Sequence, residues 1–317
     1  MKRTEVYILA GFLGSGKTTL LKRLLENERD SGRKVAVMMN ELGNVSIDSD
    51  EVGDDVALKE LLGGCICCTM SGQVEAQLQG LLQMEKPDAI YIEATGAAHP
   101  VEVLDSVLSP LFANVLHVKG IISTVDGRRW LDKGAMGPQL QQLLIEQVRH
   151  ADYLIVNKAG DLSDREQADV SISLQGLNPH AKCVLTNFSK VPLRDLRGLS
   201  HAGEKENSHV TRLQTKDLGL SSFVHTFKNP VKRERFDEFL RGMPDTVYRI
   251  KGYVKFEGSS YPDLFQFSYG MPSYIKEDMN MPLNIVMIGE NIDWAKISGE
   301  LRSLEAGFAS FEKGIEL

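Results

Sequence analysis

Residues 5–25 read EVYILAGFLGSGKTTLLKRLL, which is an apolar run followed by a glycine-rich turn and an amphipathic segment. The apolar run at 6–10 predicts a buried strand, and the segment 19–25 predicts a helix. Between them, residues 11–18 match the pattern G-x-x-x-x-G-K-[ST]. A position between a strand and a helix separates a phosphate-binding loop from a chance match. The stretch therefore predicts a site for a nucleoside triphosphate.

The residue types of this loop suit phosphate chemistry. Glycines at positions 11, 14 and 16 permit backbone conformations that are closed to residues with a Cβ. Successive amides can then converge on a phosphate at the N-terminus of a helix. Lys17 is expected to reach the β- and γ-phosphates, and Thr18 to bind Mg²⁺. The predicted phosphate-binding residues are Gly11, Gly14, Ser15, Gly16, Lys17, Thr18 and Thr19. The alternative is a tight turn that binds nothing.

Composition indicates a soluble, two-domain protein. The 317 residues are 42% hydrophobic and 25% charged. The formal net charge of -7 argues against nucleic acid as the main partner. The sequence runs from its first residues straight into a strand, and no apolar run approaches the ~20 residues of a membrane span, so we expect neither a signal peptide nor a membrane partner. Three of the four cysteines lie within four positions, which is no disulfide framework and favours a cytoplasmic protein.

The order of the apolar segments predicts the fold class. Strand-like segments alternate with amphipathic helical segments through the first two hundred residues. The strands are expected at 34–39, 88–93, 115–126, 152–156 and 182–186, and the helices at 73–82, 100–108, 139–149 and 163–174. This alternation predicts an α/β phosphate-loop NTPase fold with a doubly wound, mainly parallel sheet. Its ligands should bind at the carboxyl ends of the strands.

Composition changes near residue 199, which predicts a domain boundary. Residues 200–209, SHAGEKENSH, are polar and are typical of a linker. Beyond it, strands are expected at 221–227, 247–256, 263–269 and 283–289, and helices at 232–241 and 293–304. We therefore expect a nucleotide-binding domain at 1–199, a linker at 200–220 and a smaller α+β domain at 221–317.

Two further strand ends carry residues that suit a nucleotide site. Glu93 closes the segment 88–93, where an acid can hold Mg²⁺ directly or through water. Gly96 is placed to offer its amide to a γ-phosphate. The strand 152–156 leads into Asn157-Lys158-Ala159-Gly160-Asp161, which is close to the N-K-x-D motif that reads guanine.

The aspartate of that motif comes one position late. Gly160 stands at the expected place, and a bulge at this glycine would let Asp161 reach the base. Asn157, Lys158 and Asp161 are thus the candidate base-binding residues. The alternative is an ordinary strand-to-helix turn.

A dense cysteine motif lies between two of the strands. Residues 64–68 read Gly-Cys-Ile-Cys-Cys, and the thiolates of Cys65, Cys67 and Cys68 suit a thiophilic ion such as Zn²⁺. Three thiolates leave a fourth position that is open or filled from elsewhere in the chain, and an open position favours metal transfer over storage. The alternative is that small buried cysteines only pack well. Residues 40–48 before the motif are expected to form a loop at the position of a γ-phosphate-sensing switch, and the alternative is a plain polar β-to-α connection.

These segments together resemble those of the CobW-type phosphate-loop GTPases. The resemblance is carried by residues 11–19, 40–43, 64–68, 93–96, 147–161 and 249–253, and so it covers most of the chain. The cysteine motif beside a phosphate loop is its most specific part.

The resemblance implies a slow cytoplasmic GTPase that acts as a metallochaperone or metal-insertion factor. It implies that Cys65, Cys67, Cys68 and Glu41 bind the transition metal, Zn²⁺ or alternatively Co²⁺. By the same resemblance, Lys17 and Thr18 serve GTP or GDP, and Thr18 and Glu93 bind Mg²⁺. Glu41 and Asp48 are candidates for positioning the attacking water. The expected partner is a client metalloprotein, and a homodimer is an open alternative.

Two other functions remain open from the sequence. One is a phosphate-loop kinase for a small molecule, which would have no use for the cysteine motif. The other is a zinc-storing or regulatory protein with a vestigial nucleotide site. The intact Lys17, Thr18 and Glu93 argue against the second alternative.

Overall fold

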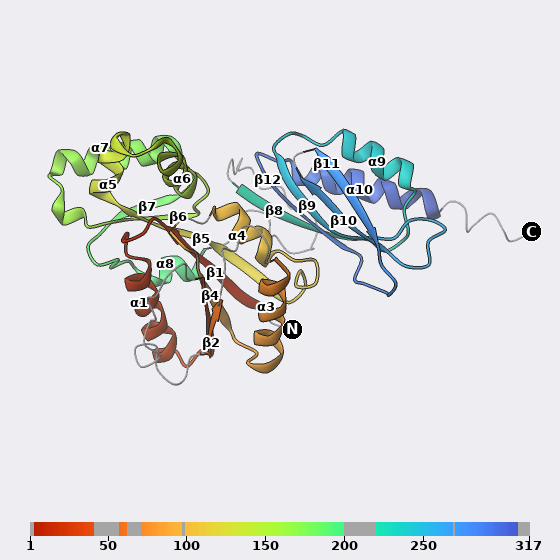
Figure 1. The fold of residues 1–317 in the computed structure, drawn as a ribbon, viewed down its shortest axis with the longest axis horizontal. Helices are drawn as coiled ribbons and strands as arrows, with labels where there is room; N and C mark the ends of the chain where they lie inside the picture. The colour runs from red at the N-terminus through yellow and green to blue at the C-terminus, as the bar shows by residue number, and fades with distance from the viewer. Residues whose placement is uncertain are drawn as a thin grey trace, which may run out of the picture. The chain divides into compact units, whose positions relative to one another are not determined.

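The computed structural model describes residues 3–40, 57–61, 71–96, 99–199, 220–268 and 270–309. The chain divides into two compact units (Figure 1). The first comprises Met1–Val107 and Val115–His201, and the second comprises Leu108–Asn114 and Ala202–Leu317. Within the described ranges, no helix is both long enough and apolar enough to cross a membrane.

The first unit is built on a seven-stranded parallel sheet. The strand order is β3-β2-β4-β1-β5-β6-β7, and every neighbouring pair runs parallel. The strands are β1 (Thr4–Gly11), β2 (Val35–Asn40), β3 (Ala57–Leu61), β4 (Ala89–Glu93), β5 (Leu116–Asp126), β6 (Tyr153–Asn157) and β7 (Lys182–Leu185). This confirms the predicted doubly wound α/β fold. The sequence analysis did not predict β3, which is an edge strand.

Helices cover both faces of this sheet. They are α1 (Lys17–Asp30), α3 (Ser71–Met84), α4 (Pro100–Val107), α5 (Gly127–Leu131), α6 (Pro138–Arg149), α7 (Asp164–Leu177) and α8 (Leu193–Arg197). Two 3-10 turns accompany them: η1 (Asp132–Ala135) lies between α5 and α6, and η2 (Ala159–Asp161) lies between β6 and α7. Figure 1 shows α1 and α8 on the opposite side of the sheet from α5, α6 and α7.

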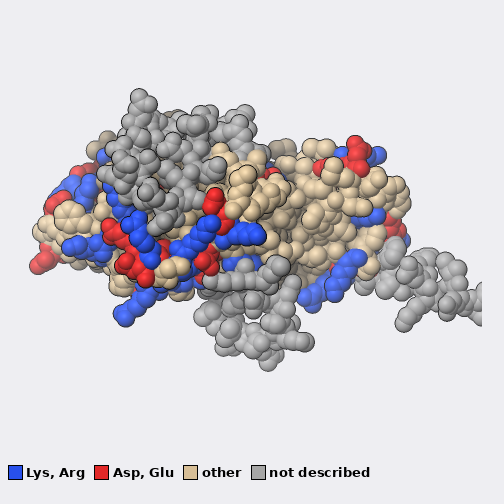
Figure 2. Space-filling model, turned by 90° about the horizontal axis from the view of Figure 1, so that it is seen from below, with Lys and Arg blue, Asp and Glu red and all other residues tan. Residues whose placement is uncertain are grey.

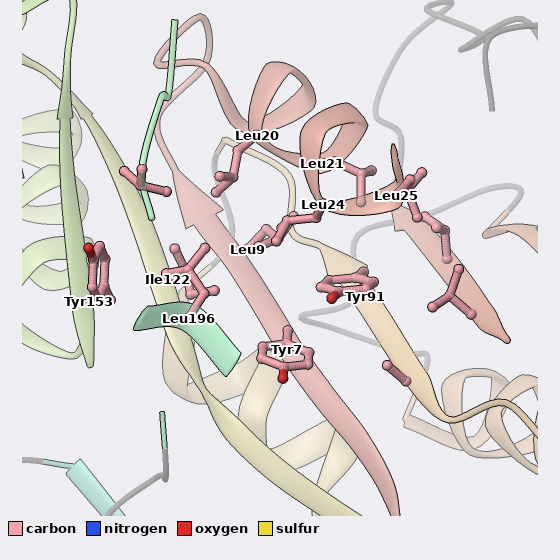
Figure 3. Packing of buried hydrophobic residues seen from close by; sticks show 14 of the residues in the cluster. Tyr7, Leu9, Leu20, Leu21, Leu24, Leu25, Tyr91, Ile122, Tyr153 and Leu196 are labelled. Atoms are coloured by element: carbon pink, nitrogen blue, oxygen red, sulfur yellow. The ribbon is translucent and has the colours of Figure 1, made fainter. Parts of the chain in front are cut away.

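The two faces of the sheet form separate cores because successive side chains of a strand point to opposite sides. In β6, Tyr153 and Ile155 join a core with residues of α1 and α8, whereas Leu154 and Val156 join a core with residues of α5, α6 and α7. Each fully buried leucine of α1 contributes about 1.5–3 kcal/mol. This packing holds the first turn of α1, and therefore the glycine-rich loop, against the sheet. Figure 3 labels Tyr7, Leu9, Leu20, Leu21, Leu24, Leu25, Tyr91, Ile122, Tyr153 and Leu196 of the first core.

A buried carboxylate also anchors α1. Glu28 is 1% exposed, and it accepts a 2.6 Å hydrogen bond from the hydroxyl of Tyr91. Its two carboxylate oxygens pair with Arg33 at 3.2 Å and with Arg197 of α8 at 3.1 Å. Burying a charge is costly unless it is paired and hydrogen-bonded. The cluster therefore ties α1 to β4 and α8, and nothing in the local sequence pattern predicted it.

The second unit is an antiparallel sheet with two helices. The strand order is β11-β10-β9-β12-β8. The elements are β8 (Leu220–Thr226), α9 (Arg233–Arg241), β9 (Val247–Val254), β10 (Asp263–Ser268), β11 (Met271–Lys276), β12 (Asn284–Glu290) and α10 (Trp294–Ala309). This confirms the predicted α+β class of the C-terminal part. Phe236 of α9 packs edge-on against Phe265 at the centre of its core. The edge strand β11 was not predicted.

Charged side chains of both signs are interspersed on the described surface. Figure 2 shows Lys and Arg next to Asp and Glu on the face that it draws. Several of these neighbours are ion pairs, such as Arg128 with Glu166 at 2.6 Å. The mixed surface agrees with the modest net charge of the sequence.

Candidate nucleotide-binding site

The glycine-rich loop connects the end of β1 to the start of α1. Gly11, Gly14 and Gly16 have φ of 134°, 75° and 110°, in the region that L-residues rarely adopt. A Cβ on Gly11 would lie 2.4 Å from the carbonyl oxygen of Thr124. A Cβ on Gly16 would lie 2.2 Å from Nδ2 of Asn157. The loop thus needs glycine at these two places for space as well as for conformation, and its amides lead into the N-terminus of α1.

Lys17 folds back over the loop. Its Nζ donates to the carbonyl oxygen of Gly11 at 2.8 Å and lies 3.4 Å from that of Phe12. The residue is 7% exposed. Burial lowers the pKa of Lys17, and the carboxylate of Glu93 opposes part of that shift. A buried ammonium that has only carbonyl partners is well suited to stabilise phosphate oxygens at the mouth of the loop.

Thr18 and Glu93 converge beside this lysine. The Thr18 hydroxyl donates to Oε1 of Glu93 at 3.2 Å. The two residues are brought together because β1 and β4 are neighbouring parallel strands, with Leu9 in register with Glu93. A hydroxyl and a carboxylate are hard oxygen donors of the kind that Mg²⁺ takes next to phosphates. The donor set therefore fits the magnesium ion that the sequence predicts.

Gly96 lies directly against the loop. A Cβ on Gly96 would lie 2.6 Å from the backbone nitrogen of Leu13. Its carbonyl oxygen accepts a 3.1 Å hydrogen bond from Nε2 of Gln147, which is buried on α6. Gln147 was not predicted as a site residue. It holds the Gly96 turn close to the loop from the opposite side.

The side chain of Asn157 joins two loops through hydrogen bonds. Its Nδ2 donates to the carbonyl oxygen of Ser15 at 2.9 Å, and its Oδ1 accepts from the amide of Ser189 at 3.0 Å. The Ser189 hydroxyl in turn donates to the carbonyl oxygen of Gly16 at 3.1 Å. Both ends of the Asn157 amide are thus engaged by backbone. The residue connects the glycine-rich loop to the segment that follows β7.

Three other side chains support the loop. The Ser15 hydroxyl lies 2.6 Å from that of Thr124 on β5, so it points into the sheet. Arg129 donates from Nη1 to the carbonyl oxygen of Leu13 at 2.7 Å, and its guanidinium carbon lies 4.9 Å from the centre of the Phe12 ring. Sequence reasoning did not assign roles to Thr124, Arg129 or Ser189. Only the position of Thr124, near the end of a predicted strand, hinted at one.

The remaining predicted base-binding residues lie at the end of β6. Lys158 has a φ of 58°, and its Nζ lies 2.7 Å from Oδ2 of Asp126. The exposed Asp161 ends the turn η2, and its amide donates to the Lys158 carbonyl at 3.1 Å. Gly160 has no positive φ, and its amide donates to Oδ1 of Asn187 at 2.8 Å. Gly160 therefore does not use a conformation reserved for glycine, and the left-handed residue of this turn is Lys158. A role for Asp161 in reading the base remains a prediction.

The predicted transition-metal ligands fall outside the described residues. These are Cys65, Cys67, Cys68 and Glu41, together with Asp48 as a candidate for positioning water. Among the predicted phosphate-binding residues, Thr19 is exposed in the first turn of α1. A Cβ on Gly14 would meet nothing within 4 Å.

Comparisons with known proteins match both units. Residues 5–185 match the family model described as CobW/HypB/UreG, nucleotide-binding domain. Residues 220–305 match the model described as the cobalamin synthesis protein cobW C-terminal domain.

Relatives at the sequence level carry names that refer to zinc. The chain is 36% identical over 226 residues to "Zinc chaperone YeiR" of Escherichia coli, covering 68% of this chain and 67% of the relative. It is 25% identical over 302 residues to "Zinc-regulated GTPase metalloprotein activator 1" of Dictyostelium discoideum, covering 80% of this chain. The match spans 63% of the length of that second relative.

A solved structure matches along nearly the whole chain. The crystal structure of Zn(II)-bound YjiA GTPase from Escherichia coli superposes with a TM-score of 0.51 at 20% identity. The superposition covers 96% of this chain and 99% of that one. At this identity the match supports the fold of the chain.

Proposed function

This chain belongs to the CobW/HypB/UreG family of nucleotide-binding proteins, and from that premise we propose that it is a GTPase metallochaperone. It binds and hydrolyses GTP at the loop formed by residues 11–18. The observation that carries the proposal is the convergence of Lys17, Thr18 and Glu93 at the start of α1. A vestigial site would not need to keep a buried lysine beside two oxygen donors.

Each group of residues at the loop has a separate role in phosphoryl transfer. Loop amides and the α1 N-terminus bind the phosphates. The Lys17 ammonium then donates its hydrogen bonds to phosphate oxygens in place of the loop carbonyls. Thr18 and Glu93 would hold Mg²⁺, which would supply positive charge to the β- and γ-phosphates. Gly96 would offer its amide to the terminal phosphate, and its close approach to Leu13 of the loop supports this role. Catalysis then consists mainly of positioning and electrostatic stabilisation.

The metal ion is the cargo of this cycle. Cys65, Cys67 and Cys68 bind Zn²⁺, or Co²⁺ if that ion is supplied, with Glu41 as a further ligand. The thiolates stay reduced in the cytoplasm, and the ion passes to a client metalloprotein. Because the loop that begins at Glu41 leads in sequence to the cysteines, the nucleotide changes the affinity for metal, and by linkage the metal changes the affinity for nucleotide. The names of the zinc-chaperone relatives support this assignment.

A turnover assay tests the enzyme part of the proposal. Phosphate release from GTP and from ATP is measured for the wild type, for Lys17→Ala and for Lys276→Ala, an exposed lysine on β11. We expect GTP to be preferred, and Lys17→Ala to lose about 100-fold or more of the GTPase rate, as for removal of one transition-state donor. Lys276→Ala should retain the wild-type rate. Equal phosphate release by the wild type and Lys17→Ala would refute the enzyme assignment.

A metal titration tests the chaperone part. Zn²⁺ affinity is measured by competition with a chelating dye in the presence of GTP, of GDP and of no nucleotide. The variant with Cys65, Cys67 and Cys68 changed to serine should lose the nucleotide-dependent binding, whereas Cys183→Ser should keep it. Equal Zn²⁺ affinities in the three nucleotide states would contradict the coupling.

A further inference from the structure

Three metal-ligating side chains meet at a place away from the cysteine motif. They are His99, Glu146 and His150, and their ligand atoms all lie within 4.8 Å of one another. Oε2 of Glu146 lies 2.8 Å from Nε2 of His150 and 3.9 Å from Nε2 of His99. Within the part of the chain that the structure describes, no other group of three His, Cys, Asp or Glu residues is this close.

Two helices hold these side chains in place. Glu146 and His150 are four residues apart at the C-terminal end of α6, so they lie on one face of it. His99 stands directly before α4, and its carbonyl oxygen accepts from the amides of Glu102 and Val103 at 3.1 and 3.3 Å. The three ligands are thus set by helix ends that are packed on the sheet, which is the rigidity that a metal site needs.

The carboxylate of Glu146 is oriented by its neighbours. Its Oε1 accepts from Nε2 of Gln142 at 2.6 Å and from Nη1 of Arg149 at 2.7 Å. Its Oε2 is the oxygen that faces the two histidines. Partners on the outer oxygen of a ligating carboxylate fix its direction, as in known metal sites.

The donor set and its spacing suit a divalent first-row ion. Two imidazoles and one carboxylate form a common set for Zn²⁺. Tetrahedral ligands at about 2.0–2.1 Å from zinc are roughly 3.3 Å apart, so the present spacing needs side-chain movements of about 1 Å. The ion would lie between the two histidines and the carboxylate oxygen that faces them.

The cluster is largely buried but open to solvent at one of its histidines. The side chains of His150 and Glu146 are 4% and 12% exposed, whereas that of His99 is 36% exposed and leaves a route for an ion. Ligation at Nε2 would move the proton to Nδ1 and end a contact with the amide of Val101. That contact is long, at 3.3 Å, and its loss costs little.

We propose that His99, Glu146 and His150 form a second site for Zn²⁺ or a similar divalent ion, independent of the cysteine motif. The site has three protein ligands and an open fourth position. It goes beyond the proposed function, which places the metal on Cys65, Cys67 and Cys68. A protein that hands over an ion gains from a second, thiolate-free site, because nitrogen and oxygen ligands exchange an ion without reduced cysteines.

The test uses the full chain with Cys65, Cys67 and Cys68 changed to serine, so that remaining metal binding reports on this site. Titration of this variant with Zn²⁺ should show that it still binds one equivalent of the ion. Titration with Co²⁺ should give d–d absorption without the sulfur-to-cobalt charge-transfer band. In this background, His99→Ala and Glu146→Gln should each weaken Zn²⁺ binding by more than about tenfold, since even loss of an outer partner of a ligand costs 10–100-fold. His180→Ala, which removes an exposed histidine of the same unit, should bind as the background does.

The outcomes separate this site from the proposed function. If the cysteine-free background binds no Zn²⁺ equivalent, or if His99→Ala and Glu146→Gln bind as tightly as the background, the second site does not exist. Circular dichroism and thermal unfolding of each variant show whether the fold is retained. Failure of the proposed function has a different signature, because it is read from GTP turnover and from the nucleotide dependence of binding in the protein with its cysteines intact.

Discussion

Nδ2 of Asn157 donates a 2.9 Å hydrogen bond to the backbone carbonyl of Ser15, which joins the end of β6 to the glycine-rich loop. The same amide accepts from Ser189 through Oδ1. Asn157, which is predicted to contact the base, therefore also holds the glycine-rich loop in place through hydrogen bonds. The position of the loop predicted to bind phosphate depends on the loop predicted to read guanine.

Asn157→Ala should weaken GTP binding by at least tenfold. The change leaves the buried carbonyl of Ser15 and the amide of Ser189 without this partner, and each such loss costs about 1–3 kcal/mol. Titration with a fluorescent GTP analogue measures the affinity, and Asn280→Ala, an exposed asparagine of the second unit, serves as the control. Wild-type affinity in Asn157→Ala would show that the hydrogen bonds of Asn157 do not support the loop.

Gly16→Ala should abolish GTP binding, whereas Gly14→Ala should retain it with a smaller loss. Both glycines have positive φ, which costs a residue with a Cβ about 1–2 kcal/mol. Only at Gly16 would the new methyl group lie 2.2 Å from Asn157, while at Gly14 nothing lies within 4 Å. The same titration compares the two variants. Similar affinities for both would mean that contact with Asn157 does not decide the loop geometry.

Glu93→Gln should raise the Mg²⁺ concentration needed for half-maximal GTP hydrolysis severalfold. Glutamine still accepts from the Thr18 hydroxyl through Oε1, but it no longer offers a negative charge to the ion. The rate is measured over a Mg²⁺ series. Glu85→Gln, at an exposed residue paired with Lys34, is the matched control. An unchanged Mg²⁺ requirement in Glu93→Gln would remove Glu93 from the magnesium site.

Glu28→Ala should destabilise the first unit by about 3 kcal/mol or more, because it leaves the surrounding arginines and a tyrosine hydroxyl without their buried partner. Glu26→Ala changes an exposed glutamate of the same helix and should cost less than about 0.5 kcal/mol. Urea unfolding followed by circular dichroism measures both free energies of unfolding. A similar loss in the two variants would show that the buried cluster adds nothing specific.

Asp126→Asn should lower stability at neutral pH, and its deficit should shrink in acid. Burial alone would raise the pKa of Asp126, but hydrogen bonds from Lys158 and from the amide of Arg129 outweigh it and hold the pKa below its ordinary value. A carboxylate with a lowered native pKa adds stability above its unfolded pKa and loses it as pH falls through the native value.

The difference in free energy of unfolding between wild type and Asp126→Asn should therefore be largest near pH 7 and decline below about pH 4. Asparagine keeps an oxygen acceptor for the amide of Arg129, so helix capping is preserved. Asp169→Asn, at an exposed residue of α7, is the control. A difference that is constant with pH would contradict the assigned pKa shift.

The two strands that sequence patterns missed share one physical property. β3 and β11 are edge strands, at the ends of their sheets, but so are β7 and β8, which were predicted, so edge position alone does not explain the difference. Central strands of a parallel sheet are buried on both faces and carry continuous apolar runs, which is why β1, β4 and β6 were predicted. An edge strand is covered less, and β11 is exposed along most of its length, so its residues follow no such pattern. Its pairing with β10 is visible only in the assembled sheet.

The sequence by itself determined the nucleotide loop, the strand-and-helix order and the two kinds of unit, because periodicity and the glycine pattern are local properties of the chain. Only the tertiary structure decided that Asn157 supports Ser15, that Glu28 is buried among arginines, and that His99 faces Glu146 and His150. Asn157 and Ser15, Glu28 and Arg197, and His99 and Glu146 lie between about fifty and more than a hundred residues apart in the sequence. These contacts depend on which strands become neighbours and on how much water the packing excludes. Neither property can be predicted from a short stretch of sequence.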